Sequence, residues 1–268
     1  MVTSTFAIDA RFGRAIICDV VLNGVVVTRK TSGDPESHSL PIQHEVVPGL
    51  NRLEFRITSR AALAVHPTPV QIPQPDGFYL EVELEEEEAE DLGDRYRMTT
   101  YEIDELEWRP EGPFELPHRE TLEFEAAPGT SRPAWMDAQP VDPGMIRSEV
   151  DAALRALHAA LSERDFERYA QLTLVRDRDM AQAYPLMGNS AARAQKNSAI
   201  LSDLLTPDAF PVPLGEELEI STEADGRLIR VVSRMGKAPL RIITPDEPEG
   251  VELPVGFAML GGALAVIR

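Results

Sequence analysis

The sequence predicts an α+β protein in which an all-β antiparallel sandwich, residues 1–127, precedes an α+β domain, residues 145–268. Three observations predict this architecture. Apolar and polar residues alternate over short runs in the first half, which is the spacing of half-buried strands. Residues 128–144 contain four prolines and no periodicity, which is typical of an extended linker. Beyond the linker, apolar residues recur every three or four positions, which is the spacing of an amphipathic helix.

The first half shows about seven candidate strands, enough for a sandwich. The clearest pair is a hairpin at Asn23-Gly24, because both residues tolerate the positive φ angles of a tight turn and alternate residues from Ile16 to Leu22 are apolar. A second pair is predicted from residues 42–47, through Pro48-Gly49, into residues 53–57. Further strands are predicted over residues 78–85, 96–108 and 122–124.

The second half should begin with three helices. We expect the first to start at about Pro143, after an Asp142 N-cap, and to carry an apolar stripe as far as Leu161. Asp165 is predicted to cap a second helix that contains Tyr169, and a third helix is expected over residues 190–205. Strands return over residues 218–220, 228–232, 240–243, 255–259 and 264–267. The pattern therefore predicts three helices packed on a curved antiparallel sheet.

Two segments of the second half resemble a known fold. The stretch AALRALHAALSERDFERYAQL resembles the opening of the NTF2-like (SnoaL-like) families, in which a long helix, a short acidic break and a second helix cover a bent sheet. The final segment VGFAMLGGALAVIR is similar to the end of that fold. The resemblance covers residues 145–268 and rests on pattern. It implies a cone-shaped pocket under the helices, whose contents differ among these families, so the fold alone fixes no function.

Charge excludes several classes of partner. The chain has 45 acidic and 26 basic residues and a formal net charge of −19. Of these, 25 acidic and 11 basic residues precede Pro128, so −14 of the charge lies in the first half. Such a field repels phosphate backbones and anionic lipid heads, so we expect no nucleic acid and no membrane as partner. The N-terminus lacks a basic segment followed by an apolar core, and a cytoplasmic location is expected.

The common signatures of catalysis and cofactor binding are absent from the sequence, which contains no P-loop, G-x-G-x-x-G, G-x-S-x-G, H-E-x-x-H or paired C-x-x-C motif. We therefore predict no catalytic residue, no cofactor and no metal. The single cysteine, Cys18, excludes an internal disulfide and is interpreted as a buried structural thiol. The five histidines lack the spacing of a zinc site. If the second domain encloses a pocket, the candidate residues are His158, Asp165, Tyr169, Asp177, Asp179 and Tyr184.

An acidic run marks the first half. It comprises Glu85, Glu86, Glu87 and Glu88, with Asp91 close behind. We interpret it as the solvated end of a strand, and a docking patch for a basic protein is the alternative interpretation.

The functional hypothesis is a non-enzymatic acidic protein-binding protein, of an immunity or inhibitor type, that docks a basic protein partner. Trp108 and Trp135 are the candidate aromatic anchors of that interface. The alternative is a small-molecule-binding protein or enzyme that uses an NTF2-like pocket in the second domain, and a component of a larger assembly is a third hypothesis. The layout is also compatible with a homo-oligomer.

Overall fold

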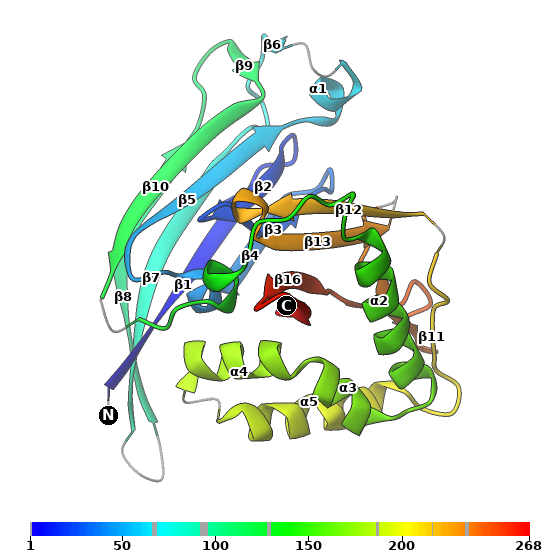
Figure 1. Cartoon of the computed structure of the whole chain (residues 1–268). Coiled ribbons are helices and arrows are strands. Elements are labelled where there is room, and N and C mark those ends of the chain that lie inside the picture. The colour runs from blue at the N-terminus through cyan, green and yellow to red at the C-terminus, as the bar shows by residue number, and fades with distance from the viewer. Residues whose placement is uncertain are drawn as a thin grey trace. The chain divides into compact units, whose positions relative to one another are not determined.

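A computed structural model describes residues 2–65, 69–91, 96–127, 130–185, 188–215, 217–233 and 236–268, and describes only the backbone of residues 2, 3, 61, 65, 89–91, 96 and 97. The chain divides into two units, residues 1–132 and 133–268. Each unit has its own hydrophobic core, and Figure 1 shows the elements of both. The described part mixes helices with antiparallel sheets, which confirms the predicted α+β fold class.

The first unit contains two four-stranded antiparallel sheets. Sheet A has the order β4-β1-β7-β8, formed by β1 (Val2–Phe12), β4 (Glu36–Pro41), β7 (Leu80–Asp91) and β8 (Tyr96–Trp108). Sheet B has the order β10-β5-β2-β3, formed by β2 (Ile17–Leu22), β3 (Val25–Lys30), β5 (Gly49–Thr58) and β10 (His118–Ala126). A 3-10 helix η1 (Gln43–Glu45), helix α1 (Arg60–Val65) and a pair of short strands, β6 (Val70–Ile72) and β9 (Phe114–Leu116), complete the unit.

Alternate side chains of both sheets point into one core, because successive residues of a strand face opposite sides. In β5, Leu53, Phe55 and Ile57 are fully buried while Arg52 and Arg56 are exposed, which confirms the predicted alternation. The Asn23-Gly24 hairpin is also confirmed. It joins β2 to β3 with positive φ angles of 53° and 84° at its two central residues.

The predicted strand over residues 42–47 is wrong. The chain crosses there from β4 of sheet A to β5 of sheet B and forms the 3-10 helix η1. The buried side chain of Gln43 accepts a hydrogen bond from the Phe6 backbone N–H at 3.1 Å, so this crossing is fixed to β1 by a side chain rather than by strand pairing.

The second unit contains two antiparallel sheets and four described helices. One sheet has the order β12-β13-β16-β17, formed by β12 (Leu218–Glu223), β13 (Leu228–Ser233), β16 (Gly256–Leu260) and β17 (Ala263–Val266). The other has the order β11-β14-β15, formed by β11 (Phe210–Pro211), β14 (Leu240–Ile243) and β15 (Val251–Leu253). The helices are α2 (Arg147–Ser162), α3 (Phe166–Leu172), α4 (Leu174–Ala183) and α5 (Ser190–Leu204), with 3-10 helices η2 (Ala134–Asp137) and η4 (Ala224–Gly226).

The helices differ from the prediction in two respects. The prediction missed α4, because its sequence LVRDRDMAQA lacks an apolar stripe. Helix α2 begins at Arg147 rather than at Pro143, since the Asp142 carboxylate accepts a hydrogen bond from Gly144 N (2.8 Å) and holds a turn instead of a helix start. The predicted cap of α3 is confirmed, because Asp165 accepts a hydrogen bond from Arg168 N at 3.0 Å. None of the described helices is both long and apolar enough to cross a membrane.

From Pro133 onward, the segment expected to be an extended linker packs within the second unit. Trp135 is only 6% exposed. Ala134 N donates to the Asp179 carboxylate at 2.9 Å, and Gln139 N donates to Met259 O at 2.9 Å. The prolines of this segment therefore prevent regular secondary structure without keeping the chain away from a core.

Candidate functional site

The outward face of sheet A gathers carboxylates from three neighbouring strands. In β7, Leu80, Val82 and Leu84 are buried in the core, so the intervening glutamates from residue 81 to residue 87 point outward. The facing residues of β1 and β8 add further acids. We call the following eight side chains the acidic face: Asp9 of β1; Glu81, Glu83, Glu85 and Glu87 of β7; and Glu102, Glu105 and Glu107 of β8.

Carboxylates lie directly opposite carboxylates across β7 and β8. The pairs in register are Glu81 with Glu107, Glu83 with Glu105, and Glu85 with Glu102. Like charges placed opposite each other destabilise a sheet. Burial raises the pKa of Glu85, and repulsion from Glu83, Glu87, Asp9 and Glu102 raises it further. The electrostatic strain of the acidic face is therefore centred on Glu85.

Two arginines among the described side chains balance part of this charge. Arg11 lies 3.9 Å from both Glu81 and Glu83, and Arg109 pairs with Glu81 and with Glu107, the latter at 2.6 Å. The other members of the acidic face form no ion pair with any described side chain; they are Asp9, Glu85, Glu87, Glu102 and Glu105. Most of the carboxylates are thus available to an external cation.

The acidic face ends at an exposed strand edge. β8 is the terminal strand of sheet A, and its register shifts beside Leu84 and Glu85. Met98, Tyr101 and Ile103 of this strand are 56%, 46% and 43% exposed. A terminal strand has backbone N–H and C=O groups that another strand can pair with, and acidic side chains along it oppose pairing with a second acidic copy. Apolar area, strand edge and negative charge therefore adjoin on β8.

The predicted acidic run lies inside a strand. Glu85–Glu88 are half-buried and lie between β1 and β8, so the interpretation as a solvated strand end is wrong. The reason is that β1 and β8 continue beside β7 beyond the run. Glu85 and Glu87 belong to the acidic face, whereas Glu86 and Glu88 point to the opposite side, where Ser4 donates a hydrogen bond to Glu86. The side chain of Asp91 lies outside the described residues.

The two tryptophans pack within their own units. The Trp108 ring stacks on His118 with 5.1 Å between centroids and meets Phe114 edge-on at 5.4 Å. Trp135 is buried in the second unit. Neither ring is presented on the acidic face. The exposed apolar side chains of β8 were not singled out by the sequence analysis, because exposure at an edge depends on strand order.

The four main candidates in the second unit each make a structural contact. His158 Nε2 lies 2.9 Å from Val212 O, and its Nδ1 lies 3.3 Å from Ser162 Oγ. Asp165 caps α3, and Tyr169 and Tyr184 are 4% and 5% exposed. These contacts connect α2 to the strand region and close the helical layer, so the geometry gives none of the four a chemical task.

A buried polar cluster joins α4 to α5. Asp177 is 1% exposed, and its Oδ1 accepts hydrogen bonds from Arg176 Nη2 (3.1 Å) and Asn197 Nδ2 (2.9 Å). Its Oδ2 has no hydrogen-bond partner among the described residues. Asp179, the other aspartate of α4 proposed from the sequence, holds the Ala134 backbone instead. The cluster ties two helices together within a unit whose core is filled by apolar side chains.

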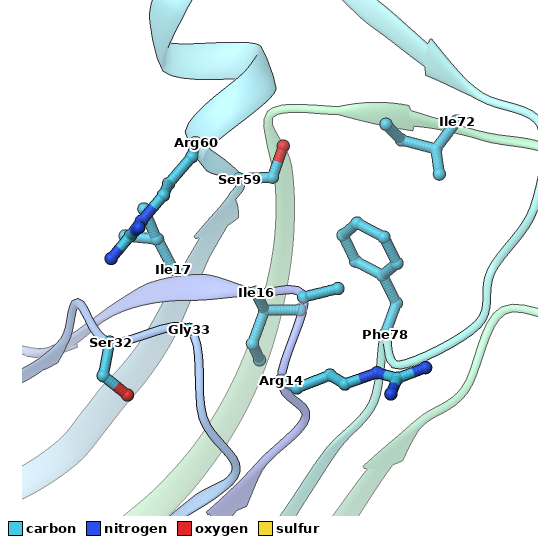
Figure 2. A pocket seen from close by; sticks show the side chains of 10 residues that line it. Arg14, Ile16, Ile17, Ser32, Gly33, Ser59, Arg60, Ile72 and Phe78 are labelled. Carbon is cyan, nitrogen blue, oxygen red and sulfur yellow. The ribbon is translucent and has the colours of Figure 1, made fainter.

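A cavity of about 400 Å³ lies at one end of the sandwich (Figure 2). Loops between the strands form it, and Ile16, Ile72 and Phe78 turn toward the same space. The full lining is Arg14, Ala15, Ile16, Ile17, Ser32, Gly33, Ser59, Arg60, Ile72 and Phe78. No motif in the sequence marks these residues, because five separate segments contribute them.

A close backbone contact holds two of these segments together. Gly13 N donates to Tyr79 O at 2.9 Å, and Ala15 N donates to Gly77 O at 3.0 Å. A Cβ atom at Gly13 would lie 2.3 Å from Gly77 O, which only glycine avoids. This contact places Phe78 beside Ile16 and so builds one wall of the cavity.

Two buried groups lie beneath the cavity. Lys30 is fully buried, and its Nζ donates to Ile16 O (2.8 Å) and Ser32 O (2.7 Å). Burial lowers the pKa of Lys30, while Glu36 and Asp34 nearby act in the opposite direction. Cys18 lies opposite Lys30 in the β2–β3 pair, and burial raises the pKa of its thiol to about 12. The thiolate is therefore scarce at neutral pH, and the prediction of a buried Cys18 is confirmed.

Neither a search for metal ligands among the described residues nor a comparison with known proteins identifies a further site. Among the described residues, no group of three or more histidines, cysteines, aspartates or glutamates could hold a metal ion. Comparison of the chain with protein-family models, with curated proteins and with solved structures finds no match.

Proposed function

We propose that this chain is an acidic protein-binding protein whose sheet A docks a cationic surface of another protein. The observation that carries the proposal is the ladder of opposed carboxylates on the acidic face, of which five form no ion pair with a described side chain. Like charges in register oppose folding of the sheet. A partner that places lysine or arginine among them relieves the repulsion and is attracted from a distance. An immunity-type or inhibitor-type protein that covers a basic partner fits this arrangement.

The exposed edge of β8 supplies the apolar contact area that the acidic face lacks. Charge complementarity sets the rate of encounter and the choice of partner, whereas desolvated apolar and aromatic contacts supply much of the affinity. Met98 and Ile103 are exposed on β8 beside the acidic face, whereas Tyr101 lies opposite Glu86 and so belongs to the other side of the sheet. The docking surface therefore comprises the acidic face as its steering region and the Met98 and Ile103 side chains as its apolar contact.

The test uses one variant in which four carboxylates of the acidic face become neutral. Partners are captured on the immobilised full chain from the cell extract of its source, at low and at high ionic strength, and identified by mass spectrometry. We expect the chain to retain a basic protein at low ionic strength and the variant to lose it. The variant carries Glu83→Gln, Glu85→Gln, Glu102→Gln and Glu105→Gln.

A matched control removes the same number of negative charges elsewhere in the first unit. It carries four substitutions at exposed positions away from the acidic face, namely Glu111→Gln, Glu115→Gln, Glu123→Gln and Glu125→Gln. We expect this control to retain the same basic protein. If the control loses that protein as completely as the acidic-face variant does, net charge alone explains the binding and the docking surface is wrong. Capture that is insensitive to both variants contradicts the proposal as well.

A further inference from the structure

We propose that the cavity at the end of the sandwich binds a small amphipathic carboxylate, a molecule with an apolar chain that ends in a carboxylate group. This site is distinct from the acidic face, and the inference does not depend on the proposed docking function. A volume of about 400 Å³ lies within the range of roughly 300–1,000 Å³ that is usual for small-molecule pockets.

The walls of the cavity favour an apolar chain. Ile17, Ile72 and Phe78 contribute aliphatic and aromatic surface, whereas Ile16 is fully buried, and Phe78 is held in place by an edge-on contact with Phe114 at 5.0 Å. Burial of apolar ligand surface against such walls is favourable in proportion to the area removed from water. Because these side chains come from strand ends fixed by backbone pairing, the apolar part of the site is already formed without a ligand.

The charges around the cavity favour an anionic head group. Arg14 and Arg60 lie at its two sides (Figure 2). Arg14 pairs with Asp76. Arg60 forms no ion pair among the described residues, and its side chain is exposed at the cavity. An exposed guanidinium next to apolar walls can bind a carboxylate through two parallel N–H donors, which is a strong and directional contact.

Two of the three carboxylates near the cavity, Asp76 and Glu36, are already engaged. Asp76 pairs with Arg14, and Glu36 pairs with His38 at 3.0 Å. The Asp34 carboxylate has no cationic side chain within 4 Å among the described residues. Asp34 lies in the same loop as Ser32 and near Lys30. The Lys30 ammonium donates its hydrogen bonds to two carbonyl oxygens rather than to a carboxylate. Its positive charge therefore lies beneath the cavity, in addition to that of Arg60. On this side of the cavity the cations Arg60 and Lys30 lie near the carboxylates Asp34 and Glu36, and Arg60 is the exposed cation that lines the cavity itself.

The experiment compares decanoate with decanol as probes of the full chain by isothermal titration calorimetry. Both probes have the same apolar chain, and only decanoate carries the charge. We expect decanoate to bind at least about tenfold more tightly than decanol, because only decanoate can form a partly desolvated ion pair with Arg60. The Arg60→Gln variant should lose about five- to tenfold in decanoate affinity and none in decanol affinity. Arg119→Gln is the matched control, because Arg119 is an exposed arginine of the same unit that does not line the cavity, and it should leave both affinities unchanged.

A second variant fills the cavity. Gly33 lies in the lining, and a Cβ atom there would meet nothing within 4 Å, so Gly33→Phe adds a large side chain without a clash in the fold. We expect it to abolish binding of decanoate. Gly215→Phe, at an equally open position of the second unit, should not affect binding. Decanol binding as tight as decanoate binding, undetectable decanoate binding, or binding that survives Gly33→Phe would each overturn the proposal.

Discussion

Sheets A and B cover the same core, but their outward faces carry charge in opposite arrangements. On sheet B, acids face bases: Asp19 forms a two-point contact with Arg29, one of its distances being 2.8 Å, and Glu54 lies 2.6 Å from Arg56. On sheet A, three glutamates of β7 face three glutamates of β8. Both sheets bury their inner faces completely at Phe12 and Phe55. The core therefore does not require the charge pattern of either face.

This difference shows that the charges of sheet B stabilise the folded unit, whereas the charges of sheet A do not. Opposed charges across neighbouring strands stabilise a sheet modestly, and like charges destabilise it by a similar amount. Sheet B therefore has the arrangement that folding favours. Sheet A has the arrangement that folding disfavours. An unfavourable arrangement in an otherwise well-packed unit is typical of a surface shaped by an interaction.

The largest expected effect comes from reversing one charge on sheet B. Arg29→Glu removes the partner of Asp19 and places a carboxylate opposite it, so that sheet B locally resembles sheet A. We expect the free energy of unfolding of the first unit to fall by about 1 kcal/mol. Urea unfolding followed by Trp108 fluorescence in a Trp135→Phe background measures it, because each unit contains one tryptophan. An unchanged midpoint would mean that the pairing on sheet B contributes nothing to stability.

The reverse substitution on sheet A should have the opposite sign. Glu102→Arg places a cation opposite Glu85 and converts one opposed acidic pair into an ion pair. We expect the first unit to gain about 0.5 kcal/mol, and the gain to shrink as salt screens the charges. Glu125→Arg is the control, because Glu125 faces Leu50 across the strands and has no charge opposite it. If both substitutions stabilise the unit equally, the gain reflects net charge and not the cross-strand pair.

The sequence predicted those features that depend on neighbouring residues. The Asn23-Gly24 turn, the alternation in β5 and the Asp165 cap are local, since each depends on residues a few positions apart. The segment at residues 42–47 was misjudged because its conformation is set by a long-range contact, from Gln43 to the backbone of β1. Helix α4 was missed because its buried residues are an aspartate, Asp177, and the small Ala183, which together form no apolar stripe.

The candidate site was predictable only in part. Composition located the excess of charge in the first half, and two residues of the predicted run, Glu85 and Glu87, belong to the acidic face. Its partners across the sheet, such as Glu102 and Glu105, could not be identified, because strand order and register decide which acids meet. The cavity at Arg60 is equally hidden, since it needs five segments brought together by the fold. The NTF2-like resemblance of the second half stays a prediction.

The smallest expected effect gives the most specific test, because it follows the titration of Glu85. Its pKa in the folded unit is raised above the ordinary value of 4.5 by burial and by the surrounding carboxylates. The unfolded chain therefore releases this proton at lower pH than the folded unit does, and the contribution of Glu85 to stability is full below pH 4.5 and is lost as the pH rises through the folded pKa.

Glu85→Gln has no such titration, so it should exceed the wild type in stability by about 0.3 kcal/mol at pH 7 and match it near the ordinary pKa of a glutamate. Urea unfolding of the first unit, repeated from acidic to neutral pH, measures the difference. Glu123→Gln is the matched comparison on sheet B, where Glu123 faces Arg52 and its neutralisation removes a favourable neighbour. We expect the two substitutions to change stability in opposite directions at pH 7. A loss of stability in Glu85→Gln at neutral pH would show that the acidic face is not under electrostatic strain, and would remove the contrast between the two sheets.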